Sequence, residues 1–170
     1  MNHVAMAYIC SFTRQSNTWN SASATWLLPV VASVVAAVSG GVVASQLAPY
    51  DPQLALSVLI VAYVVWGTGV PVAMFIITLW ITRTAIVGLP NPAALGSMFL
   101  PLGPCGQGSF GILIIEKTIR CLAYDHGTPF TVDDSASALR TADVAWGFGN
   151  IVGLALWGLG LCFYILAHAE

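Results

Sequence analysis

Long stretches without a formal charge constrain this chain more than any other feature. No Asp, Glu, Lys or Arg lies between Arg14 and Asp51, between Asp51 and Arg83, between Arg83 and Glu116, or between Asp143 and Glu170. Each stretch is longer than the roughly 20 apolar residues that an α-helix needs to cross a bilayer. Only 7% of the residues are charged, whereas a soluble domain carries about 25%. The sequence therefore predicts an all-α integral membrane protein with about four transmembrane helices.

Turn-forming residues and charges give the predicted organisation. Residues 1–23 are predicted to be a polar N-terminal lead-in, followed by a single transmembrane domain over 24–167. Its spans are predicted at about 24–48, 54–81, 93–115 and 143–167, with a polar loop at 116–141. The dipeptide Leu28-Pro29 recurs as Leu100-Pro101, each time before a segment of small residues. This weak repeat indicates two helix hairpins, each pairing a small-residue helix with a bulkier one.

Charge and cysteine patterns argue against several other classes. The net charge of −2 includes no basic run, so nucleic acid is not a predicted partner. The four cysteines lack metal-type spacing, and no metal site, disulfide framework or cofactor is predicted. Acidic and His side chains in the polar loop could bind a cation, although a solvated loop explains them better: Asp125, His126, Asp133 and Asp134. Cys105 with His126 would suit a thiol enzyme, but no basic group is near Cys105 in sequence, so no enzyme is predicted.

Residues 99–115, FLPLGPCGQGSFGILII, would interrupt the third span. Pro101 and Pro104 remove backbone donors, and such a break survives in hydrocarbon only inside protein or beside a water-filled cavity. A half-helix that starts near Cys105 would direct its free N–H groups at the break, where Gln107 and Ser109 add donors. That arrangement suits an anion. A structural kink packed against neighbouring helices is the alternative.

Small residues also line the first span. Ser33, Ala37, Gly41 and Ala44 share one helical face, which is either a packing surface or a narrow pore wall. In the last span, Gly149 and Gly153 form a GxxxG pattern, which indicates helix packing.

Three segments resemble a known family. Leu100–Ile112, LPLGPCGQGSFGI, resembles the seventh-helix signature of fungal sulfite efflux pumps, which belong to the tellurite-resistance/dicarboxylate transporter family. Malate permeases and plant slow anion channels are relatives. Trp26–Ala44 is similar to the fifth helix of those pumps and Ala138–Ile165 to the eighth. The resemblance covers about Ser11 to the C-terminus, and the opening MNHVAMAYI does not look like family sequence.

The resemblance implies ten helices in five hairpins, with the odd, proline-kinked helices lining a pore. This chain would be a partial copy, and the aromatic gate of the family would belong to a helix that it lacks. The implied function is sulfite efflux across the plasma membrane, in a voltage-dependent anion channel-like protein. Malate transport, or a non-transporting membrane interaction fragment, remain alternatives. The implied partners are a small anion, the lipid bilayer, and a second copy or a full-length relative.

The residues expected to form the pore or substrate path come from the first and third spans. They are Pro29, Ser33, Pro101, Gly103, Pro104, Cys105, Gly106, Gln107, Gly108 and Ser109. Helix packing is expected at Gly40, Gly41, Gly149 and Gly153.

Overall fold

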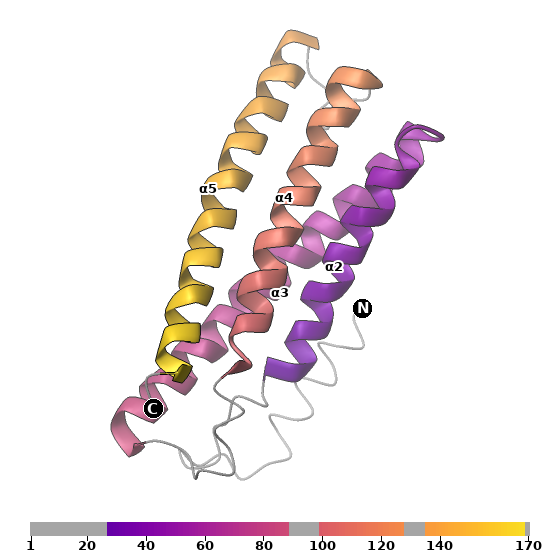
Figure 1. Ribbon diagram of the computed structural model, residues 1–170. Helices are drawn as coiled ribbons and strands as arrows, with labels where there is room; N and C mark the ends of the chain where they lie inside the picture. Colours follow the sequence, from indigo (N-terminus) through magenta and orange to yellow (C-terminus); the bar gives the residue numbers. More distant parts are fainter. Residues whose placement is uncertain (1–26, 89–98, 128–134, 169–170) are drawn as a thin grey trace.

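The computed structural model describes residues 27–88, 99–127 and 135–168, and these form four α-helices without a strand. The helices are α2 (Leu28–Leu47), α3 (Pro52–Val87), α4 (Leu102–Asp125) and α5 (Ser135–His168). Helices α2 and α3 form one hairpin, α4 and α5 form the second, and α4 packs against all three other helices. In Figure 1, α3 passes behind α2 and α4 while α5 lies along α4. The predicted all-α fold with two helix hairpins is confirmed.

The first hairpin turns through Ala48–Asp51, at the boundary between the first two predicted spans. The backbone N–H groups of Tyr50 and Asp51 both donate to the carbonyl oxygen of Leu47, at 3.0 Å. The Asp51 carboxylate then accepts from the N–H of Leu54 at 3.0 Å, and Pro52 occupies the first turn of α3. An N-cap oxygen and a proline at this position satisfy or remove donors that have no partner inside the helix. Local sequence therefore determines this turn.

The second hairpin is longer than the predicted spans. Helix α4 continues ten residues past the predicted end of the third span, and α5 begins at Ser135, so helix occupies both ends of the predicted loop 116–141. The reason is an apolar stripe that continues across the charged residues. Ile112, Ile115, Ile119 and Leu122 follow one another at three- and four-residue intervals, and all are buried. Packing of this stripe holds the helix together beyond Glu116.

Three of the four described helices are long and apolar enough to cross a membrane: α2, α3 from Pro52 to Ile86, and α5 from Ala136 to Ala167. Helix α4 is not among them, because it contains Glu116, Lys117, Arg120 and Asp125. Large apolar side chains also cover the outside of the bundle, including Val61, Phe75, Ile151, Trp157 and Ile165, each more than half exposed. So much exposed apolar surface needs lipid or protein against it. The chain is therefore a multi-pass membrane protein.

Two clusters of buried side chains hold the hairpins together. The larger one lies among α2, α3 and α4 and includes Val34, Leu59, Trp66, Ile112 and Ile115, and it reaches α5 through Leu156. The smaller one lies near the start of α4 and includes Leu27, Val30, Ile77, Cys105 and Phe163. Helix α4 contributes to both clusters, so it is the central element of the described fold.

Candidate functional site

The prolines expected to break a helix lie at helix starts. Pro29 occupies the first turn of α2, and Pro101 immediately precedes α4. Pro104 lies in the first turn of α4, where a backbone N–H has no partner inside the helix, so its absence costs little. From there α4 runs without interruption to Asp125. The half-helix expected near Cys105 thus begins at Leu102, and residues 89–98, which precede it, lie outside the described residues.

The expected path residues of α4 divide between two faces of the helix. Pro101, Pro104, Cys105, Gly108 and Ser109 are buried, whereas Gly106 and Gln107 are exposed and Gly103 is half-buried. The exposed face continues through Phe110, which is 50% exposed, to Lys117. These positions recur at the intervals of one helical face. That face points away from α3, because Gly108 on the opposite side lies against Val70 of α3.

Two hydrogen bonds join the buried face of α4 to α3 and α5. The Ser109 hydroxyl donates to the carbonyl oxygen of Gly153 on α5 at 2.8 Å. The Trp66 indole N–H of α3 donates to the carbonyl oxygen of Gly108, also at 2.8 Å. In this structure the Ser109 hydroxyl therefore gives its O–H to a backbone acceptor, as a buried hydroxyl in an apolar interface does, and its role toward an anion stays a prediction. Gln107 keeps an uncovered position.

The small-residue face of α2 is turned toward the other helices. Ala37, Gly41 and Ala44 are buried, and a Cβ added at Gly41 would lie 3.0–3.1 Å from Ile114 and Ile115 of α4. Ser33 is half-buried, and its Cβ would lie 3.5 Å from a Cβ added at Gly69 of α3. Of the two interpretations of this face, the structure therefore favours close packing.

The other three glycines expected at packing contacts also lie where a neighbour approaches. A Cβ added at Gly40 would lie 3.0 Å from the Cβ of Ala62, and one at Gly153 would lie 3.1 Å from Leu113. Gly149 lies directly over the side chain of Glu116. These contacts join α2 to α3 and α4 to α5, and each leaves no room for a larger residue.

The geometry separates the two groups that a thiol enzyme would need. Cys105 is buried near the start of α4, and His126 follows its last residue. At 1.5 Å of rise per residue, the two lie about 30 Å apart along the helix, so they cannot act as a nucleophile and base. No group of three potential metal ligands occurs among the described residues. Asp133 and Asp134 lie outside them.

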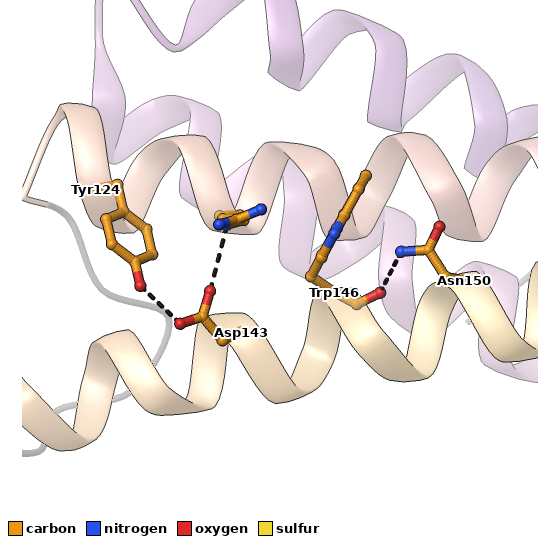
Figure 2. Close-up of polar contacts among 5 residues, drawn as sticks. Tyr124, Asp143, Trp146 and Asn150 are labelled. Atoms are coloured by element: carbon orange, nitrogen blue, oxygen red, sulfur yellow. Dashed lines mark hydrogen bonds and ion pairs between the residues drawn. The ribbon is translucent and has the colours of Figure 1, made fainter.

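A polar cluster joins α4 and α5 near the closed end of the second hairpin (Figure 2). The Arg120 Nε lies 3.2 Å from one carboxylate oxygen of Asp143, and the Tyr124 hydroxyl donates to the other at 2.7 Å. The guanidinium also lies 5.5 Å from the ring centroid of Tyr124 and 6.0 Å from that of Trp146. The hydrogen bond to Asp143 raises the pKa of Tyr124, since an ionised phenol would lose that bond and face a second negative charge. This cluster fixes α4 to α5 at one end.

Sequence reasoning missed Glu116 as a structural residue by assigning it to the polar loop. Its side chain is buried, with 1% exposed, in the interface between α4 and α5. The repeat of Ile112, Ile115 and Ile119 around it could have revealed that the helix continues. Trp66 was missed for lack of any local signal, because its partner Gly108 is 42 residues away.

Comparison with known proteins decides the family. The family described as voltage-dependent anion channel matches residues 1–169. The chain belongs to this family. The match begins at residue 1, which corrects the expectation that the resemblance starts near Ser11.

Curated members of the family support the same assignment. Sulfite efflux pumps SSU1 of Arthroderma benhamiae and Trichophyton rubrum are each 36% identical over 173 residues, and that of Arthroderma otae is 35% identical over 170. Each alignment covers 98% of this chain and 43% of the relative. The chain therefore spans less than half the length of these relatives. No solved structure matches it.

Proposed function

We propose that this chain contributes α4, held in place by α2, to an anion path across the plasma membrane, and that the anion is sulfite, moved outward. The observation that carries this proposal is the 35–36% identity, over nearly the whole chain, to three proteins named sulfite efflux pumps. Membership of a voltage-dependent anion channel family supports the wider class of substrate.

The uncovered face of α4 is the part of the chain that we assign to the path. Gly103 and Gly106 leave this face without side chains at the start of the helix, and Gln107 adds an amide beside them. Within the described residues, no side chain caps the start of α4, so no acidic or hydroxyl group of theirs satisfies the positive end of its dipole. An amide donor and a helix N-terminus suit an anion without requiring a buried cation.

The buried residues have a different proposed role. Pro101, Pro104, Cys105 and Gly108 fix where α4 starts and how closely it packs. Pro29 does the same for α2. Enclosure of a path then requires further helices, supplied by a second copy or a full-length relative. The exposed apolar side chains on both hairpins provide the surface for such an association.

The test is anion flux through the 170-residue chain in liposomes, with sulfite and malate measured in parallel and empty vesicles as the baseline. Gln107→Leu should reduce sulfite flux by at least about tenfold, because a hydrogen bond to a charged group contributes about 1.5–3 kcal/mol. Gln53→Leu, at an exposed position on α3, is the matched control and should leave flux unchanged.

Other results would redirect the proposal. Equal flux in the Gln107 variant and the wild type would remove α4 from the path. Malate flux without sulfite flux would replace the substrate. A folded, inserted chain that moves neither anion, yet associates with a full-length relative, would favour a regulatory role.

A further inference from the structure

Glu116 has no polar partner in the described fold. Its side chain is 1% exposed, and neither carboxylate oxygen has a hydrogen-bond partner. It packs over Gly149 of α5, where an added Cβ would lie 3.0 Å from the Cβ of Glu116 and closer still to its Cγ. Buried polar groups nearly always have a partner, so this exception requires an explanation.

The charged and titratable groups around Glu116 leave it uncompensated. On α4, Lys117 faces outward, and Arg120 is one turn away but pairs with Asp143 of α5. On α3, Tyr63 is near enough to interact electrostatically with Glu116, and a phenol brings no positive charge. Helix α2 contains no charged residue. No cation in the described fold therefore neutralises this carboxyl group.

The free-energy cost of burying Glu116 depends on whether its carboxyl group is protonated. An ionised carboxylate without a partner in a low-dielectric interior costs several kcal/mol, whereas the neutral acid costs far less. A cation one helical turn away could compensate the ionised form, because residues at i and i+4 are neighbours on the helix surface. Arg120 is such a cation. Its ion pair with Asp143 is about half exposed on both sides and is correspondingly easy to exchange.

We propose that Glu116 is a buried proton-binding site, and that Arg120 moves from Asp143 to Glu116 when the proton leaves. The O–H bond of the Glu116 carboxyl breaks, the proton goes to solvent, and the guanidinium neutralises the carboxylate that remains. Asp143 keeps the hydrogen bond from Tyr124. The α4–α5 interface then exists in two charge arrangements, which differ in whether Arg120 ties α4 to α5 or folds back along its own helix.

Infrared difference spectroscopy of the purified 170-residue chain in detergent tests the proton directly. At neutral pH the wild type should show the carbonyl stretch of a protonated carboxyl, and Glu116→Gln should lack it. Asp125→Asn, which removes an exposed carboxyl from the same helix, is the matched control and should retain the band. The wild-type band should disappear reversibly as the pH rises.

A second variant tests the movement of Arg120. Asp143→Asn removes the present ion-pair partner of Arg120, so the guanidinium is free to stabilise the ionised form of Glu116. The midpoint pH at which the band disappears should therefore fall by a few tenths of a unit, which corresponds to the free energy of an exposed ion pair. If the midpoint pH of this variant equals that of the wild type, the proposed movement of Arg120 from Asp143 to Glu116 is wrong. A neutral-pH band of equal size in the wild type and in Glu116→Gln would overturn the proton site itself.

Glu116→Asp covers the case in which the Gln variant does not fold. It keeps an acid but shortens it, so it should retain a protonated-carboxyl band at a shifted frequency; an unshifted band would assign the signal to another group and overturn the proposal. None of these measurements depends on transport, so a failure here is distinct from a failure of the flux experiment.

Discussion

Gly111 is the position where the close packing of the two hairpins can be tested most sharply. A Cβ added there would lie 2.9 Å from a methyl group of Val38 on α2 and 3.1 Å from the Trp66 ring on α3. Real Cβ atoms are rarely this close to a neighbour. Gly111→Ala therefore forces α4 away from two helices at once or twists both side chains out of their rotamers. Such overpacking costs about 1–3 kcal/mol.

The higher helix propensity of alanine stabilises the Gly111→Ala variant and so opposes the steric destabilisation. A control variant must therefore account for it. Alanine in place of glycine stabilises a helix interior by about 1 kcal/mol. Gly106→Ala supplies the control, because Gly106 is on the same helix and a Cβ there meets no described residue within 4 Å. The propensity gain is shared by both variants and cancels. The difference between them, about 1–3 kcal/mol in favour of Gly106→Ala, is the steric cost alone.

The assay is reversible unfolding of both variants in mixed micelles, followed by circular dichroism as the denaturing detergent is increased. Gly106→Ala should be at least as stable as the wild type, and Gly111→Ala should be clearly less stable than Gly106→Ala. Equal stability of the two alanine variants would refute the inference that α2, α3 and α4 meet closely at Gly111.

Two further predictions concern polar contacts between helices. Trp66→Phe should lower the free energy of unfolding by about 1 kcal/mol, because it removes the bond to the Gly108 carbonyl and keeps an aromatic ring; in detergent unfolding, a variant as stable as the wild type would contradict this contact. The hydrogen bond to Asp143 is the chief cause of the raised pKa of Tyr124. The stability that this bond contributes should therefore be fully present below the ordinary tyrosine pKa of about 10, and it should be lost as the pH rises through the raised pKa. Ultraviolet titration should show Tyr124, identified by subtraction of Tyr124→Phe, ionising at a lower pH in Asp143→Asn, and an unmoved midpoint would exclude Asp143 as the cause.

The sequence predicted the general fold because its strongest signals are local. Charge-free stretches gave the membrane class, and the Asp51-Pro52 turn gave the boundary between α2 and α3. The bounds of α4 could not be predicted in the same way. Charge at Glu116 suggested a loop, but burial of Ile115 and Ile119 holds the helix to Asp125. Tertiary packing overrides local polarity there, and the repeat of Ile112, Ile115 and Ile119 is the one local signal that the helix continues past Glu116.

The candidate site was predicted in part for the same reason. The segment from Pro101 to Ser109, where a half-helix was predicted to start near Cys105, includes the start of α4 at Leu102. Which of its residues are buried depends on where α3 and α5 lie, so Ser109 was assigned to an anion although it bonds Gly153. The importance of Gly108 and Glu116 to packing followed only from contacts with Trp66 and Gly149, far away in sequence.

The distribution of glycines along α4 supports the proposal that its uncovered face lines a path. Gly108 and Gly111 are explained by α2, α3 and α5, which leave no room for a side chain. Among the described residues, Gly103 and Gly106 have nothing within 4 Å of an added Cβ, yet glycine in a helix costs about 1 kcal/mol relative to alanine. Packing within the described part of the chain does not offset that cost. Under the proposed function the neighbour that offsets it is an ion path or another helix at backbone distance, and the proposal therefore places the face beside Gln107 in a structure larger than these two hairpins.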